Sequence, residues 1–208
     1  MRLCALLAVA LFLAGCGASA SGSEKPSATA YPTWTHPPKM TINKGATYKA
    51  TVETSDGAFT ITLLPKLAPL AVNNFIFLAQ HDFYKGVIFH RIIKNFMVQT
   101  GDPTGTGFGG PGYTFHDEKV TLPYASGTVA MANSGPNTNG SKFFIIASRQ
   151  GYHLQPIYTI FGRVTSGMDT VYKIADTPVV QNPASNEVSE PAPGQEPSIK
   201  SVTIHESK

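Results

Sequence analysis

Apolar and polar residues alternate along two neighbouring segments, 48–52 and 59–63, as they do in strands that bury one face. The residues between them, Ser55, Asp56 and Gly57, are typical of a hairpin turn. Pro69 then begins a segment whose apolar residues have helical spacing: Val72, Phe75, Ile76 and Ala79. This part of the chain predicts a β-hairpin followed by a helix, in a folded domain that begins near Ala46.

The rest of the domain consists of short apolar runs separated by loops rich in Gly and Pro. We expect strands at residues 87–93, 96–100, 127–132, 142–147, 157–164 and 199–205, and a second helix at 167–175. The polar segment 178–197 has the composition of a mobile loop. Many short strands and two helices predict a mainly β domain, residues 46–206, built as a closed or nearly closed antiparallel barrel.

The N-terminus has the pattern of an export signal. Arg2 precedes twelve uncharged residues, 3–14, which as a helix of about 18 Å would be too short to cross a bilayer. Residues 13–16, Leu-Ala-Gly-Cys, resemble a bacterial lipobox. We therefore expect a lipoprotein signal peptide at 1–15 and acylation of Cys16, which would anchor the chain to the extracytoplasmic face of a bacterial membrane. Ordinary signal cleavage beside an unmodified Cys16 is the alternative.

The cysteine count agrees with this interpretation. Cys4 lies in the segment that would be removed, so Cys16 would be the single remaining thiol and no disulfide could form within the chain. Residues 16–45 are then expected to form a flexible tether, because residues 17–30 contain no large apolar side chain. Trp34, the only tryptophan, could pack on the domain or touch lipid headgroups.

Composition excludes several classes of function. The 208 residues carry a formal charge of +3 without any basic run, which argues against nucleic-acid binding. The six histidines lack the spacing of metal ligands, so no metal or other cofactor is expected. Residues 105–110 fit the G-x-G-x-x-G pattern of nucleotide sites, but Pro111 and Gly112 follow at once and prevent the required helix. Nothing in the sequence suggests an assembly interface, so a monomer is expected.

Two stretches place polar residues within apolar runs. Residues 89–93, Phe-His-Arg-Ile-Ile, lead into Phe96, Met97 and Gln99, and residues 131–141 lead into a pair of phenylalanines at 143–144. Taken alone, Arg91 could be a surface charge and the aromatic residues could belong to the core. Together they are typical of a shallow apolar pocket with a fixed cation at its rim.

These stretches, with the Gly-Asp-Pro at 101–103, resemble the cyclophilin family of peptidyl-prolyl cis–trans isomerases. The resemblance runs from about residue 47 to 204 and implies an eight-stranded antiparallel barrel capped by two helices. It also implies that proline-containing peptide segments are the substrates. Together with the export signal, this predicts that the segments belong to exported proteins. A binding module that holds such segments with negligible turnover is the alternative function.

Carried over by position, the resemblance implies Arg91, Phe96 and Gln99 as catalytic residues. It implies a substrate-binding set of Met97, Gly105, Ala132, Asn133, Ser134, Lys142, Phe144, His153, Leu154 and Tyr158. Three of these depart from the best-known members: Lys142 replaces Gln, His153 replaces Trp and Tyr158 replaces His. Because cyclosporin uses that Trp, we expect weakened binding of the drug.

Overall fold

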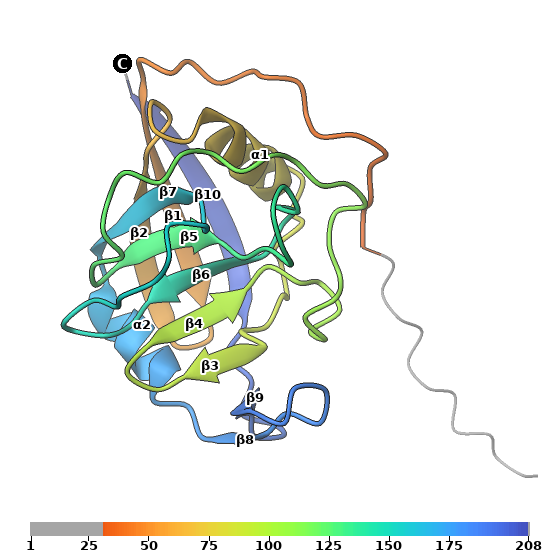
Figure 1. The fold of residues 1–208 in the computed structure, drawn as a ribbon, viewed down its shortest axis with the longest axis vertical. Helices are drawn as coiled ribbons and strands as arrows, with labels where there is room; N and C mark the ends of the chain where they lie inside the picture. Colours follow the sequence, from red (N-terminus) through yellow and green to blue (C-terminus); the bar gives the residue numbers. More distant parts are fainter. Residues whose placement is uncertain (1–30, 208) are drawn as a thin grey trace, which may run out of the picture. The chain divides into compact units, whose positions relative to one another are not determined.

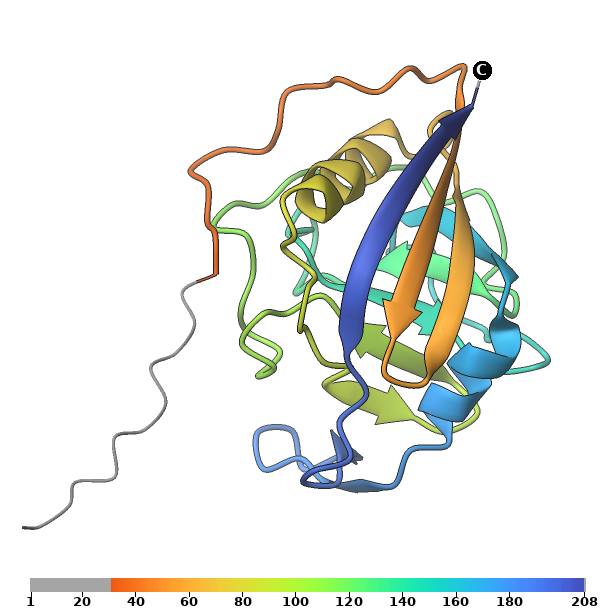
Figure 2. The ribbon, with the colours of Figure 1, turned by 180° about the vertical axis from the view of Figure 1, so that it is seen from behind.

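The protein is described by a computed structural model that covers residues 31–207. Eight strands form one curved antiparallel sheet in the order β10-β1-β2-β7-β5-β6-β4-β3 (Figure 1). Their bounds are β1 Thr47–Thr54, β2 Gly57–Leu63, β3 Arg91–Ile93, β4 Met97–Thr100, β5 Thr128–Met131, β6 Phe143–Ile146, β7 Ile160–Ser166 and β10 Ile199–Ser207. Two helices, α1 Pro69–Gln80 and α2 Met168–Ala175, lie near opposite ends of the sheet, and Figure 2 shows β1, β2 and β10 from behind. Neither helix is long and apolar enough to span a membrane.

The predicted closure of the barrel is wrong, because β3 and β10 are separate edges of the sheet. A short bridge narrows the gap between them: Gly86 N–H donates to Ile199 O at 2.7 Å, and Phe89 N–H donates to Pro197 O at 2.8 Å. The ladder does not continue, since β3 has three residues and Pro197 has no N–H to donate. The structure is an open half-barrel.

Alternation along the central strands buries both faces of the sheet. In β6, Phe143 and Ile145 face the main core, whereas Phe144 and Ile146 belong to a second cluster on the other face. The main core also holds Phe75 of α1 and Phe161 of β7, whose ring centroids lie 5.3 Å apart. The second cluster contains Met97, Ala130, Ala132 and Ile160 among others, and it forms the floor of the site described below.

Helix α1 receives its N-terminal cap from a distant residue. Pro69 occupies the first turn, where its missing N–H costs nothing, and no side chain at Ala68 caps the helix. The carboxylate of Glu118 instead accepts the N–H groups of Leu70 and Ala71, each at 2.9 Å. A long loop is thereby tied to the first turn of the helix.

Part of the predicted tether packs on the domain. The ring of Trp34 lies 5.0 Å from that of Phe77, and the backbone N–H of Trp34 donates to Pro111 O at 2.8 Å. The side chain of Asn73 in α1 accepts the N–H of Thr41 at 2.9 Å and donates to Lys39 O at 3.0 Å. Residues 34–41 therefore lie along α1, because Trp34 finds aromatic partners there. Cys16 and residues 1–30 lie outside the described residues.

The segment predicted to be a mobile loop forms a second, two-stranded sheet instead. Strand β8, Val179–Gln181, pairs antiparallel with β9, Val188–Pro191. This hairpin contacts β3, the short edge strand (Figure 1). A segment expected to be an irregular loop thus forms regular strands, because the hairpin has a partner that its polar composition does not reveal.

Candidate active site

One row of cross-strand neighbours brings a cation next to apolar side chains. Arg91 of β3 lies opposite Gln99 of β4, and Gln99 lies opposite Phe144 of β6. Phe144 in turn lies opposite Ala130 of β5. Residues directly opposite one another project from the same face of a sheet, so the four side chains share the outer face.

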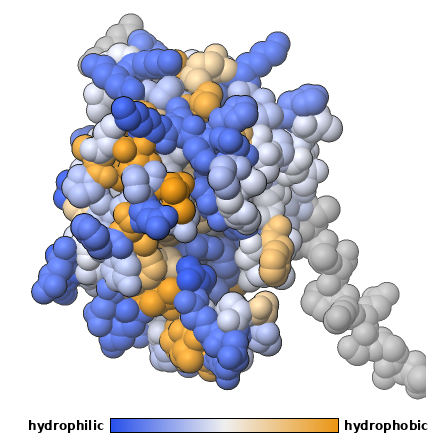
Figure 3. All heavy atoms as spheres, viewed as in Figure 1, coloured by the Kyte–Doolittle hydropathy of each residue, from blue (hydrophilic) through white to orange (hydrophobic). Residues whose placement is uncertain are grey.

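A pocket of about 400 Å³ lies over this row. Its floor is apolar: Met97 and Phe144 are almost fully buried, and the ring of Tyr158 meets Phe144 edge-on at 5.5 Å. The pocket is lined by His90, Arg91, Phe96, Met97, Gln99, Thr106, Gly107, Phe108, Ala132, Asn133, Ser134, Lys142, Phe144, Leu154, Tyr158, Asn182, Ala184 and Ser185. Figure 3 shows that apolar patches on this face of the domain are broken up by polar side chains.

Arg91 is the charged group at the rim. Its side chain is 34% exposed, and its guanidinium forms two hydrogen bonds with the carboxylate of Glu187. A guanidinium is charged at every working pH and presents five N–H donors in a fixed plane. The site therefore holds a permanent cation beside an apolar floor.

Gln99 and His90 form a polar pair behind Arg91. The amide nitrogen of Gln99 lies 3.1 Å from His90 Nε2, and an amide nitrogen can only donate. Burial lowers the pKa of His90 to about 4, so the imidazole is neutral near pH 7. His90 is thus a packed, hydrogen-bonded histidine, and it fixes the amide of Gln99.

A buried carboxylate shapes the glycine-rich side of the pocket. Asp102 accepts the N–H groups of Thr104, Gly107 and Gly109 at 2.7, 2.6 and 3.1 Å. Burial raises the pKa of Asp102, but the hydrogen bonds from Thr104 and Gly109 outweigh it and bring the pKa below its ordinary value. The loop is held in a fixed curve, and Phe108 projects from it with 83% of its surface exposed.

Lys142 and Asn133 are two further polar residues of the pocket lining. The Lys142 ammonium donates to Gly107 O, which ties the residue before β6 to the glycine-rich loop. Burial lowers the pKa of Lys142, and Asp102 opposes this shift. The Asn133 side chain donates to Ile157 O at 2.9 Å, so its backbone is held at the edge of the pocket.

Most of the site residues expected from the sequence line the pocket together, and two do not. Gly105 lies outside the lining, with a φ of +70° and with Ile88 packed against it. His153 is exposed beyond the lining, whereas its neighbour Tyr152 stacks on Phe96 with ring centroids 3.9 Å apart.

Sequence reasoning missed two segments of the site. Thr106, Gly107 and Phe108 belong to the glycine-rich stretch, which the sequence analysis considered only as a nucleotide motif. The hairpin loop at 182–185 and Glu187 were hidden in the segment predicted to be mobile. Glu187 is far from Arg91 in the sequence, so no local pattern predicts that the two side chains form an ion pair.

Residues 49–204 match the family model described as "Cyclophilin type peptidyl-prolyl cis-trans isomerase/CLD". The chain belongs to this family. A peptidyl-prolyl cis-trans isomerase-like 1 from Emericella nidulans is 52% identical over 60% of this chain and 79% of its own length. A peptidyl-prolyl cis-trans isomerase-like 3 from Homo sapiens is 43% identical over 74% of this chain and 94% of its own. The cyclophilin is thus a peptidyl-prolyl cis–trans isomerase by family and by curated relatives.

Solved cyclophilins share the fold. A Cryptosporidium parvum cyclophilin-type isomerase superposes with a TM-score of 0.68 at 34% identity, covering 78% of this chain and 99% of that one. A second structure of that protein, determined in the presence of the dipeptide Ala-Pro, gives 0.67 at 35% identity. The mainly β fold with two helices is confirmed. All of these relatives are eukaryotic, and their names say nothing of a lipid anchor.

Proposed function

We propose that Arg91 is the catalytic group of this isomerase, and that the chain works on exported proteins while anchored by lipid at Cys16. One observation carries the catalytic part: Arg91 lines an apolar pocket whose floor is Met97 and Phe144. The proline ring is apolar and its nitrogen has no N–H. The ring can therefore pack on such a floor without a hydrogen-bond partner there.

Arg91 fits the chemistry of rotation about a prolyl bond. The bond turns slowly because its C–N has partial double-bond character. In the twisted state the nitrogen regains its lone pair and becomes a strong hydrogen-bond acceptor. An N–H of Arg91 aimed at that nitrogen binds the transition state better than either planar isomer, and this difference accelerates the reaction. No proton is transferred.

The magnitudes require more than this one hydrogen bond. An increase from about 10⁻² to about 10³ s⁻¹ corresponds to roughly 7 kcal/mol at 1.36 kcal/mol per decade. A charge-assisted hydrogen bond contributes about 1.5–3 kcal/mol in a typical protein setting. The apolar floor excludes water and strengthens the bond, while the rim at Asn133 and Ser134 holds the peptide backbone in register.

The anchor rests on the sequence of residues 1–16. A diacylated Cys16 would hold the domain at the extracytoplasmic face of a bacterial membrane, since two acyl chains anchor far more firmly than one. The substrates would be exported proteins whose folding rate is limited by prolyl isomerisation. Reduced affinity for cyclosporin stays a prediction, supported by the exposed position of His153.

Two measurements on the full chain, expressed in a bacterium and purified in detergent, test the proposal. Cys16→Ser should abolish incorporation of labelled fatty acid and release the protein from membranes, whereas the matched Cys4→Ser should change neither. The wild type should also accelerate the proline-limited refolding of an exported protein in a concentration-dependent way. Binding to that protein without acceleration would instead identify a holding module.

A further inference from the structure

The β8–β9 hairpin forms a wall of the active site. Its loop contributes Asn182, Ala184 and Ser185 to the pocket lining, and β9 contacts the edge strand β3 that carries Arg91. The loop is internally braced, because Asn182 N–H donates to Glu187 O at 2.6 Å and Asn186 N–H donates to Asn182 O at 2.8 Å. Glu187 therefore stands at a defined place beside β3.

Glu187 binds Arg91 along one edge of the guanidinium. Arg91 Nε donates to Oε2 at 2.8 Å and Nη2 donates to Oε1 at 3.1 Å. This bidentate contact fixes the plane of the guanidinium and uses two of its five N–H donors. The Nη1 donors and the second N–H of Nη2 are left for other partners.

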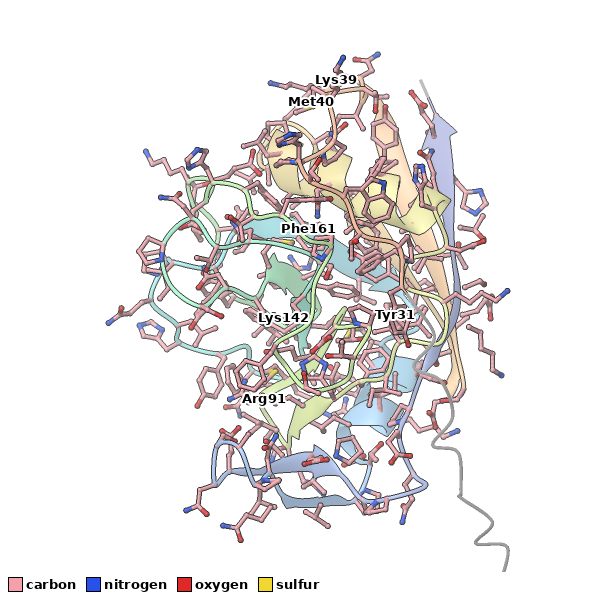
Figure 4. All side chains as sticks on the ribbon, turned by 90° about the vertical axis from the view of Figure 1, so that its right-hand side faces the viewer. Tyr31, Lys39, Met40, Arg91, Lys142 and Phe161 are labelled. Carbon is pink, nitrogen blue, oxygen red and sulfur yellow. The ribbon has the colours of Figure 1, made fainter. Side chains whose placement is uncertain are left out.

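Only one member of this pair lines the pocket. Arg91 lines the pocket, and within the described residues Glu187 is not among its lining groups. Figure 4 shows Arg91 between the sheet and the hairpin. The Glu187 carboxylate therefore binds Arg91 without itself lining the pocket.

We propose that Glu187 is a positioning residue for the isomerase reaction, which holds the Arg91 guanidinium in the orientation that meets the twisted prolyl nitrogen. This inference rests on the catalytic role proposed for Arg91. A long, partly exposed arginine otherwise samples many rotamers, and only a few of them direct an N–H at the substrate. Fixing the plane in advance removes that ordering cost from the catalytic step.

Stability is a weaker explanation for the pair. The two side chains are 34% and 37% exposed, and ion pairs at such exposure contribute little to folding. The hydrogen bonds from Arg91 lower the pKa of Glu187, so the carboxylate remains charged at neutral pH. The pair therefore persists under the conditions in which the enzyme works.

The test compares Glu187→Gln with Glu190→Gln in the full chain. Glu190 is an exposed acidic residue of the same hairpin and lies outside the pocket lining, so its variant controls for loss of one negative charge. We expect Glu187→Gln to lower kcat by about tenfold with little change in KM, since misplaced catalytic groups lose rate rather than binding. Glu190→Gln should match the wild type, and thermal unfolding should be nearly the same for both variants.

A double-mutant cycle separates positioning from a merely structural role. Glu187→Gln should have no further effect in an Arg91→Ala background, measured by NMR exchange of a prolyl peptide at high enzyme concentration. An equal loss in both backgrounds, or wild-type kcat in Glu187→Gln, would overturn the proposal. A higher kcat/KM in Glu187→Gln would overturn it too, since Glu187 would then compete with substrate. If Arg91→Ala itself turns over normally, the role of Arg91 fails first.

Discussion

Arg91 and Phe144 lie in the same cross-strand row, two strands apart, with Gln99 between them. Neighbouring strands are about 4.8 Å apart, so the guanidinium and the aromatic floor are within reach of one prolyl dipeptide. The register of three short strands, rather than any loop, sets this spacing. A one-residue slip of β4 would turn Gln99 inward and break the row.

The buried His90 should make the stability of the protein depend on pH. Its pKa of about 4 in the folded state lies below the ordinary 6.5, so the unfolded chain binds the proton more readily. The contribution of His90 to the free energy of unfolding is fully present above pH 6.5. It is lost as the pH falls toward 4, and the loss is about 3 kcal/mol at 1.36 kcal/mol per pKa unit. Urea unfolding at pH 7 and pH 4 should show a smaller loss for His90→Gln than for the wild type. The exposed His205→Gln is the control, and equal losses in all three proteins would contradict the prediction.

Gly101 should tolerate no side chain, whereas Gly86 should. Both have positive φ, +88° and +80°, but a Cβ at Gly101 would lie 2.3 Å from Ser141 O and one at Gly86 would meet nothing within 4 Å. Gly86→Ala should cost about 1 kcal/mol of backbone strain. Gly101→Ala should cost more than about 3 kcal/mol, because the strands beside the pocket must separate. Chemical denaturation measures both, and similar losses would show that the contact with Ser141 is easily relieved.

Lys142 should give the enzyme a preference for acidic peptides. Its ammonium lies at the pocket rim, and Asp102 opposes the effect of burial on its charge. Replacing it by Gln should lower kcat/KM for a prolyl peptide with a Glu near the proline by a few-fold, and leave a neutral peptide unchanged. The preference should shrink with added salt. The same selectivity in Lys142→Gln and wild type would assign it to another group.

The sequence predicted the fold where period and turn chemistry are strong. The hairpin around Asp56, helix α1 after Pro69 and helix α2 all occur as expected, because their signals are local. The strand predicted at 87–93 is shorter in the structure, where β3 covers only Arg91–Ile93. The residues before β3 form hydrogen bonds with the segment 197–199 instead of extending the strand. A barrel closes only if its two edge strands, here β3 and β10, form hydrogen bonds with each other. The local sequence pattern of either strand does not predict this pairing.

The candidate site was predictable to the same extent. The floor residues Met97 and Phe144 and the cation Arg91 stand in the motifs that carry the family resemblance, and the structure brings them together. Glu187 was missed because its partner lies 96 residues away in a segment of low apolar content. The sequence did not decide whether Trp34 packs on the domain or touches lipid. A tryptophan in a proline-rich stretch gives no indication of the aromatic residues that it contacts in the structure.

The central claim is that Arg91 performs the catalysis, and one comparison tests it directly. Prolyl-peptide turnover should be measured for Arg91→Ala and for Arg163→Ala, which removes an exposed arginine from β7. The account predicts that Arg91→Ala loses at least about tenfold, and up to about 150-fold, in kcat/KM, because one charge-assisted hydrogen bond to the transition state is lost. Its circular dichroism and unfolding should remain near those of the wild type. Arg163→Ala should be fully active. Wild-type turnover in Arg91→Ala would contradict the account.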